Sequence, residues 1–192
     1  AFNLQQPDSL NIQIQATDVQ CFGDSTGRIT PIVTGGSGAY QFNWNNTSTD
    51  SLQTGLEAGQ YCVTVSDNNA CVTNTCVDLT QPSAIAVDSF RITPVDCYGQ
   101  FTGQASVFVS GGNGPYEYLW EDDLAQIGIT ASNLPAGEVG VTVIDFNRCE
   151  LDTSVFIPQP DSLQLSITSE DARCREGNEG QASVVVEGGT AP

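Results

Sequence analysis

The 192-residue chain has no histidine and no lysine, and its five basic residues are all arginines. Histidine is the commonest general base and the commonest zinc ligand, so its absence excludes Ser-His and Cys-His catalytic pairs and His-metal centres. The absence of lysine excludes Schiff-base chemistry and a lysine-to-asparagine isopeptide crosslink. Paired carboxylates are the one catalytic chemistry left open, and nothing in the sequence marks such a pair. We therefore do not expect an enzyme.

Charge of one sign dominates the chain. It has 23 Asp and Glu against the five arginines, for a formal net charge of −18. Such a chain repels nucleic acid and anionic membranes, so neither is an expected partner. No apolar run reaches the length of a membrane helix. The first residues lack the basic region and apolar core of a signal peptide, so we expect the numbering to start inside a longer chain.

What the chain has in quantity is repetition. The stretch GGSGAYQFNW at residues 35–44 returns as GGNGPYEYLW at residues 111–120, and GGTAP begins it again at Gly188. Aromatic residues alternate with polar ones in both copies, which is typical of a strand with one buried face. The predicted core aromatics are Tyr40, Phe42 and Trp44 in the first copy and Tyr116, Tyr118 and Trp120 in the second. Stacking of the tryptophans on sugar rings is the alternative interpretation.

Other short stretches of the first copy alternate in the same way. Strands are expected over residues 10–14, 29–33, 40–44, 63–65 and 75–79, with Gly-rich and Asn-rich turns between them. Six or seven short strands in about 76 residues predict an all-β fold of tandem immunoglobulin-like β-sandwich repeats. The predicted domains are residues 1–81 and 82–159, followed at 160–192 by the first two strands of a third repeat.

Two local features refine this prediction. Residues 56–61 resemble the corner at which a tyrosine side chain caps the turn into a late strand of immunoglobulin-like folds. The second copy has Val139 in place of Tyr61, so the hydrogen bond of that corner cannot form there. Pro31 removes a backbone donor from its strand, which predicts a bulge or a local sheet edge at that point.

The seven cysteines have no CxxC spacing, which favours an oxidising, extracytoplasmic setting. Cys62 and Cys76 are replaced together in the second copy, by Gly140 and Ser154. Both are equally far from Asn69, at the centre of a predicted hairpin, where cross-strand partners lie close enough for a disulfide. We therefore expect a Cys62–Cys76 disulfide on the outward face of the sheet.

The remaining cysteines recur in two series: Cys21, Cys97 and Cys174 in one, and Cys71 and Cys149 in the other. Bridges inside each repeat would join Cys21 to Cys71 and Cys97 to Cys149. In an immunoglobulin-like topology those partners lie at opposite ends of the sandwich, roughly 20 Å apart, whereas a disulfide needs about 6 Å between Cα atoms. Repeats that follow end to end favour a bridge between repeats, Cys21 to Cys149. The other three cysteines would then pair with repeats outside this segment.

The ordered set of motifs resembles SprB-type repeats. It comprises the recurring cysteine, the GG-x-x-x-Y-x-x-x-W stretch, the L-x-x-G turn and the asparagine-to-cysteine turn. Ala70, Arg148 and Val139 depart from the usual pattern. The resemblance implies a large surface adhesin of Bacteroidota, of the gliding-motility kind, exported by type 9 secretion to the cell surface at the outer membrane. It also implies three sets of partners: neighbouring repeats, a surface polysaccharide or substratum bound through other regions, and the secretion and motility machinery.

Glu121, Asp122 and Asp123 form the most acidic cluster, in a stretch that is two residues longer in the second copy than in the first. They are weak calcium candidates, because no D-x-D-x-D-G loop accompanies them and a solvated acidic loop has the same composition. No other metal and no cofactor is expected. The function expected is that of a structural shaft, which holds a distal binding region away from the cell and bears load. The alternative is a carbohydrate-binding module array of a secreted polysaccharide-degrading protein, which would require an exposed aromatic platform.

Overall fold

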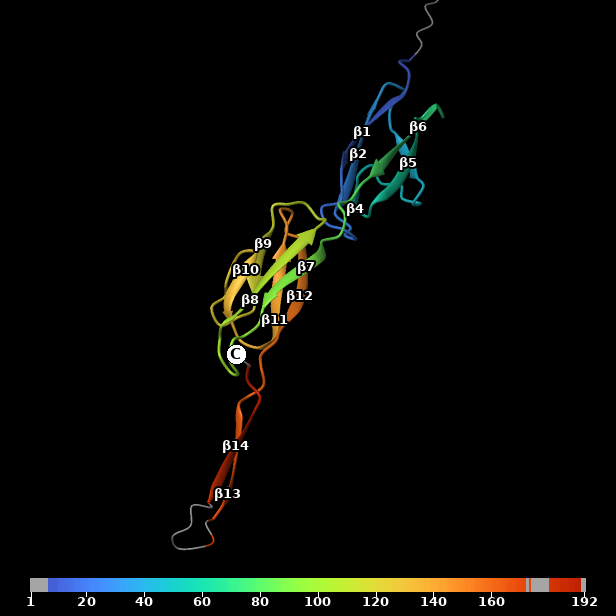
Figure 1. The fold of residues 1–192 in the computed structure, drawn as a ribbon. Helices are drawn as coiled ribbons and strands as arrows, with labels where there is room; N and C mark the ends of the chain where they lie inside the picture. The colour runs from blue at the N-terminus through green and yellow to red at the C-terminus, as the bar shows by residue number, and fades with distance from the viewer. Residues whose placement is uncertain (1–6, 172, 174–179, 191–192) are drawn as a thin grey trace, which may run out of the picture. The chain divides into compact units, whose positions relative to one another are not determined.

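A computed structural model describes residues 7–171, 173 and 180–190, which form strands, turns and loops without a helix (Figure 1). No helix capable of crossing a membrane therefore occurs in this part of the chain. The strands are β1 (Asn11–Thr17), β2 (Gly27–Thr34), β3 (Gln41–Trp44), β4 (Gln53–Leu56), β5 (Gly59–Ser66), β6 (Val72–Leu79), β7 (Ala86–Thr93), β8 (Gly103–Ser110), β9 (Glu117–Trp120), β10 (Thr130–Leu134), β11 (Gly137–Ile144), β12 (Glu150–Ile157), β13 (Gln164–Glu170) and β14 (Gln181–Glu187).

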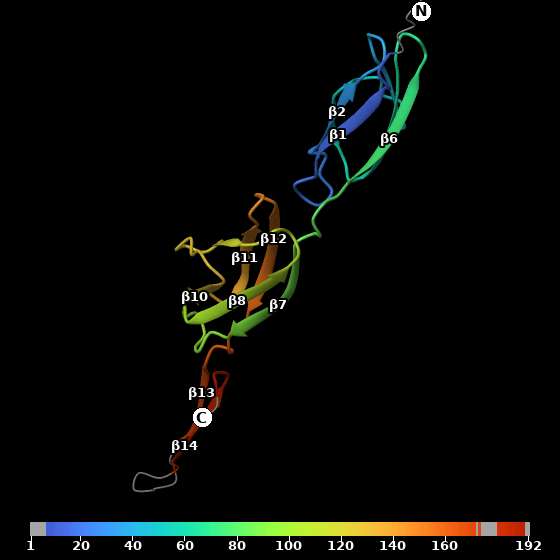
Figure 2. The same ribbon diagram turned by 90° about the horizontal axis from the view of Figure 1, so that it is seen from above.

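Both full repeats have the same antiparallel topology. The first has one sheet ordered β1-β2-β4 and a second ordered β3-β5-β6, and the second has β7-β8-β10 and β9-β11-β12. In the second repeat, β7 and β8 form one layer and β11 and β12 the other (Figure 2). This arrangement of two three-stranded sheets confirms the predicted immunoglobulin-like sandwich.

Each sandwich has its own core between its two sheets. Trp44 is 3% exposed and Trp120 is 1% exposed, and each packs among branched aliphatic residues from both sheets. The core of the first repeat comprises Ile29, Trp44, Leu56, Val63, Val65 and Leu79. The core of the second comprises Val95, Ala105, Val107, Trp120, Ala131, Leu134, Val139, Val141, Val155 and Ile157.

The prediction that all six aromatic residues are buried was wrong for four of them. Tyr40, Phe42, Tyr116 and Tyr118 are half-buried, and Tyr40, Phe42 and Tyr118 pack against their core clusters as partly buried residues. The Tyr40 hydroxyl donates a hydrogen bond to the carbonyl of Gly35, at 2.7 Å. The rings of Tyr116 and Tyr118 meet edge to face, with centroids 6.5 Å apart.

The paired glycines that precede the aromatic strand form a corner in each repeat, called here the glycine corner (residues 35–38 and 111–114). Gly35 and Gly36 have φ of 76° and 68°, a region that strongly favours glycine. A Cβ atom on Gly36 would lie 2.9 Å from a carboxylate oxygen of Asp67, and one on Gly35 would collide with the carbonyl of Ser9. Both the backbone conformation and the close packing therefore require glycine.

The expected tyrosine corner is present only in the first repeat. The Tyr61 hydroxyl donates to the carbonyl of Glu57 at 3.1 Å. In the second repeat Val139 is 3% exposed and joins the hydrophobic core instead. Pro31 pairs with Ile14 without a shift in register, and β4 pairs only with Gly27 to Ile29 of β2. Pro31 therefore lies at a local sheet edge and not in a bulge.

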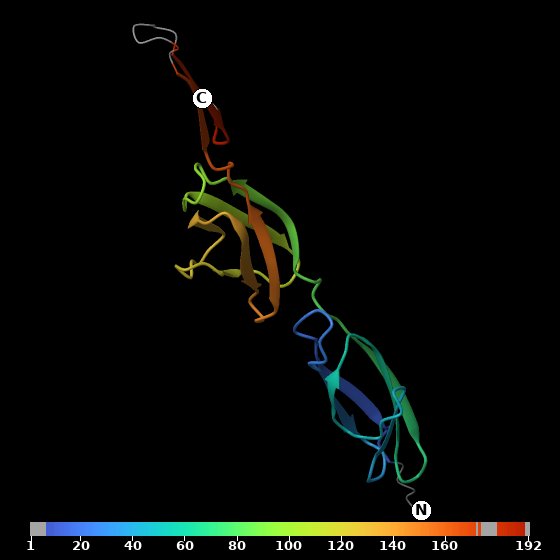
Figure 3. The same ribbon diagram turned by 90° about the horizontal axis from the view of Figure 1, so that it is seen from below.

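The third repeat is described only as the antiparallel pair β13 and β14, drawn in red (Figure 3). Leu165 lies opposite Val186, and Ile167 lies opposite Val184. All four side chains are more than half exposed. This pair matches the β1-β2 pair of the first repeat, in which Ile12 and Val33 are opposite each other and pack against the core.

The chain divides into two compact units, one of which includes two short segments of the second repeat. One unit holds residues 1–85 together with residues 111–115 and 145–149 of the second repeat, and the other holds the rest. The two short segments are the glycine corner of the second repeat and the turn that contains Cys149.

Candidate functional site

A buried aspartate organises the turn that precedes each recurring cysteine, called here the Asp turn (residues 67–71 and 145–149). One carboxylate oxygen of Asp67 accepts hydrogen bonds from the N–H groups of Asn69 and Cys71, both at 2.9 Å. Its other oxygen accepts from the N–H of Ser37 in the glycine corner at 2.9 Å. Asp145 repeats these contacts with Asn147, Cys149 and Asn113. The aspartate thus joins the Asp turn to the glycine corner of the same repeat.

The hydrogen bonds also determine the charge state of Asp67. Burial alone would raise its pKa, but the N–H groups of Cys71, Ser37 and Asn69 outweigh this effect and lower the pKa below the ordinary aspartate value of 3.8. The carboxylate is therefore ionised at neutral pH, with its oxygens held by backbone donors.

The loop that carries the other recurring cysteine is held by the chain that leaves the same repeat. In the first repeat this cysteine loop spans residues 18–26, and in the second it spans residues 94–102. Gln81 Oε1 accepts from the N–H of Gly23 at 2.8 Å, and Gln159 Oε1 accepts from the N–H of Gly99 at 3.0 Å. Both glutamines belong to the Gln-Pro pairs that end a repeat. Each cysteine loop is therefore fixed at the point where the next repeat starts.

Cys21 and Cys149 form a disulfide inside the first compact unit, with Cα atoms 5.6 Å apart. Cys21 belongs to the cysteine loop of the first repeat and Cys149 to the Asp turn of the second, so the bridge joins consecutive repeats. The cysteine loop and the Asp turn that it connects are called here the joint. Asn147 Nδ2 donates to the carbonyl of Gln20 at 2.9 Å, between the same two segments. This is the pairing favoured by the sequence argument about the ends of the sandwich.

The alternative pairing inside each repeat does not form. Cys71 and Cys97, which it requires, are free and exposed. Cys174, the third member of the cysteine-loop series, lies outside the described residues.

The second disulfide joins Cys62 to Cys76 across β5 and β6. The two cysteines are register partners with Cα atoms 4.0 Å apart, and the hairpin between them is centred on Asn69 as expected. Both are half-buried or exposed while the adjacent Val63 is buried, so the disulfide lies on the outward face. In the second repeat the register partners are Gly140 and Ser154.

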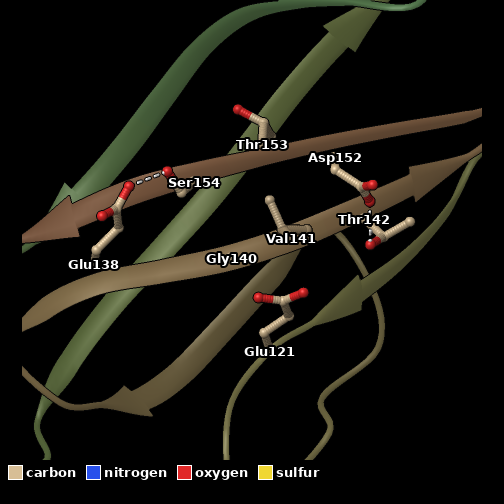
Figure 4. A pocket seen from close by; sticks show the side chains of 8 residues that line it. All are labelled: Glu121, Glu138, Gly140, Val141, Thr142, Asp152, Thr153 and Ser154. Carbon is tan, nitrogen blue, oxygen red and sulfur yellow. Dashed lines mark hydrogen bonds between the residues drawn. The ribbon is translucent and has the colours of Figure 1, made fainter.

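The acidic residues of the second repeat take several different partners instead of meeting at one point (Figure 4). The Glu121 carboxylate lies over Gly140, where a Cβ atom would collide with it. Glu138 accepts a hydrogen bond from Ser154, and Asp152 accepts one from Thr142 at 2.7 Å. Together they line a shallow polar groove of about 510 Å³ on the outer face of β11 and β12.

The calcium candidates Glu121, Asp122 and Asp123 also have different surroundings and do not share a common partner. Asp122 accepts from the backbone N–H and the side-chain amide of Gln126, at 2.9 and 2.6 Å, and so shapes the inserted loop. Burial would raise the pKa of Asp122, but the bonds from Gln126 lower it overall. Asp123 is exposed and Glu121 faces Gly140. Among the described residues no group of three metal-binding side chains comes together.

Sequence reasoning missed two parts of this joint, although a signal for each was present. The pattern Asp-X-Asn-X-Cys recurs intact at 67–71 and 145–149, and this recurrence was the available sign that Asp67 and Asp145 organise the turns. Gln81 and Gln159 each precede a proline at the end of a repeat. Their recurrence at the end of each repeat was the available sign that their side chains hold the cysteine loops.

Tandem β-sandwiches with disulfides inside and between repeats define an extracellular repeat surface protein. Residues 14–49 and 89–125 match the family model of the SprB repeat, which confirms the predicted resemblance to SprB-type repeats in both sandwiches. The matched segments run from the first strand of each sandwich to the stretch that follows the buried tryptophan.

Two solved structures have limited similarity to this chain. A C-terminal 282-residue fragment of intimin, in complex with the intimin-binding domain of the translocated intimin receptor, is 16% identical with a TM-score of 0.43. The match covers 82% of this chain and 67% of that one. Domains 4–9 of the surface layer protein SbsC are 14% identical with a TM-score of 0.31, over 95% of this chain and 36% of that one. No curated protein gives a significant match.

Proposed function

We propose that this chain is a load-bearing shaft segment of a large surface adhesin of the SprB gliding-motility type, exported by type 9 secretion and held at the outer membrane. Its role is structural, and it has no catalytic activity. The SprB-type repeats and the disulfide between consecutive repeats support this proposal.

The covalent path through the chain is the observation that carries the proposal. The Cys21–Cys149 disulfide spans 128 positions of sequence. A pulling force that enters through β1 reaches Cys21, crosses the sulfur bridge to Cys149 and leaves through β12. The chain from residue 22 to residue 148, which includes most of both cores, lies outside that path. Load can therefore pass along the segment without unfolding the sandwiches.

The alternative function, a carbohydrate-binding array, needs aromatic faces that a sugar ring can reach. Trp44 and Trp120 are buried, and their indole N–H groups donate to the carbonyls of Asp50 and Gly128, both at 2.9 Å. These tryptophans therefore support the folded core and not a sugar platform. Adhesion is assigned to other regions of the adhesin, with a surface polysaccharide or the substratum as the partner.

The proposal is tested in cells that display the full adhesin. Cys21→Ser with Cys149→Ser removes the bridge between repeats, and attachment is measured under increasing shear flow at matched surface amounts. We expect the variant to detach at lower shear, because load must then pass through the sandwiches. Cys62→Gly with Cys76→Ser is the matched control. It removes a disulfide that lies between residues 22 and 148, outside the load path. It also introduces the glycine and serine that the second repeat has at these positions, so attachment should not change. Equal detachment of the Cys21/Cys149 variant and the wild type at every shear would contradict the proposal.

A further inference from the structure

The cysteine loop of the second repeat reproduces that of the first, although its cysteine has no partner. The N–H of Asp96 donates to Thr102 Oγ1 at 2.9 Å, and Gln159 holds Gly99 as described above. The equivalent bonds in the first repeat join Gln20 to Thr26 and Gly23 to Gln81. Cys97 therefore occupies the position of Cys21 in an equivalent frame, but its thiol is free and exposed.

A groove of about 540 Å³ lies beside Cys97. One side is the cysteine loop, with Asp96, Cys97 and Tyr98, and the other is the start of the third glycine corner, with Gly189 and Thr190. In the preceding joint these two kinds of segment are bridged by the Asp turn at 145–149. That turn bonds to Asn113 of the glycine corner and to Gln20 of the cysteine loop. The groove is thus bounded by the two surfaces that an Asp turn contacts.

Within the described residues, no second sheet packs on the strands beside the groove, β13 and β14. Leu165 and Val186 occupy the places of Ile12 and Val33, which are half-buried against the core of the first repeat. Leu165 and Val186 are 64% and 57% exposed. In the first repeat, Ile12 and Val33 pack against a core cluster to which the second sheet contributes Val63 and Val65 of β5 and Leu79 of β6.

We propose that the groove at Cys97 and the apolar face of β13 and β14 form one docking site for a hairpin of this repeat family whose turn reads Asp-X-Asn-X-Cys. The hairpin lays its apolar strand on β13 and β14, and its cysteine forms a disulfide with Cys97. Continuity with the Cys21–Cys149 joint identifies this occupant, since the same loop holds the same turn there. The inference rests on the proposed function, because it treats the joint as a unit that repeats along the shaft.

The covalent step is a thiol–disulfide exchange. The hairpin is supplied with its turn cysteine as a mixed disulfide with a small thiol. The Cys97 thiolate attacks the sulfur of the turn cysteine, the new bridge forms, and the small thiol leaves and takes up the proton lost by Cys97. No external oxidant is needed.

The chain itself contains a suitable probe. A synthetic peptide of residues 59–79 includes both strands of the β5-β6 hairpin, and its Cys62–Cys76 disulfide holds the register. Its Cys71 carries the small thiol. The peptide is mixed with the 192-residue protein, and peptide mapping measures its coupling to Cys97 and to Cys71 of the protein. The measured quantity is the ratio of coupling at Cys97 to coupling at Cys71. Both thiols are exposed, so the same ratio measured with glutathione disulfide gives the reference for their difference in accessibility and reactivity.

We expect the hairpin to favour Cys97 over Cys71 at least tenfold beyond the glutathione ratio. An Asn69→Ala peptide should lose most of this preference, because Asn69 matches the Asn147 that bonds the cysteine loop. Coupling of the hairpin in the same ratio as glutathione would overturn the inference. The digest also reports Cys21–Cys149. Absence of the Cys21–Cys149 bridge would contradict the proposed function. An intact bridge with no preference of the hairpin for Cys97 would contradict only the proposed docking site.

Discussion

Truncation of Trp120 tests whether the second sandwich depends on its buried aromatic residue. Trp120 is 1% exposed and packs between both sheets. Trp120→Ala should therefore cost about 3–5 kcal/mol in free energy of unfolding. A repeat of this size has a total stability of only about 4–11 kcal/mol, so the variant should bring the second repeat close to unfolding.

Trp120→Phe separates packing from hydrogen bonding. The phenyl ring retains much of the packing, but the carbonyl of Gly128 loses the indole N–H that lies 2.9 Å away. We expect a cost of about 1–3 kcal/mol, smaller than that of the alanine variant. Leu119→Ala is the matched control, since Leu119 is the adjacent residue on the outward face and is 45% exposed. It should cost less than about 1 kcal/mol.

Urea unfolding followed by circular dichroism and by tryptophan fluorescence measures these changes. The two tryptophans lie in different repeats, so Trp44 is the only fluorophore of its type left in the Trp120 variants and reports the first repeat. Its transition should stay near that of the wild type while the second repeat unfolds early. A loss of less than about 1 kcal/mol for Trp120→Ala would refute the assignment of Trp120 to the core.

Three further predictions concern the first repeat. Because folding lowers the pKa of Asp67, ionised Asp67 stabilises the fold above its unfolded pKa near 4, and this contribution disappears as pH falls through the folded value. Asp67→Asn should therefore lower the urea midpoint at pH 7 and much less near pH 2. A pH-independent difference would count against the carboxylate bonds. Ala70 has a φ of 60°, so Ala70→Gly should stabilise the first repeat by up to about 1 kcal/mol in the same assay. A decrease in stability would show that the turn is not strained. Cys62→Gly with Cys76→Ser should cost at most about 3 kcal/mol, and a larger loss would mean that the bridge holds more than the β5-β6 hairpin.

The positions of several strands, the fold class and the bridge between repeats could be predicted from the sequence, because they follow from periodicity and topology. Alternation of apolar and polar residues identified β1, β2 and β3, and the joint loss of Cys62 and Cys76 identified a disulfide. The Cys21–Cys149 pairing required only the length of a strand and the direction of the chain.

Details that depend on where a strand ends were not accessible in the same way. Alternation reports which face a residue is on, but not how far along the strand the second sheet extends, so Tyr116 was expected to be as buried as Trp120. The interaction of Glu121 with Gly140 depends on cross-strand register, which is fixed only when the hairpin forms. Side-chain bonds that cross long stretches of sequence, such as Gln81 to Gly23, were hidden for the same reason.

Single-molecule pulling on the chain from its two ends tests most directly whether load passes through the bridge. With the Cys21–Cys149 disulfide intact, the chain between the two cysteines cannot extend. Reduction should release it and lengthen the fully unfolded contour by about 420–460 Å, the extended length of the 128 positions that the bridge spans. Equal contour lengths with and without reductant would contradict the account.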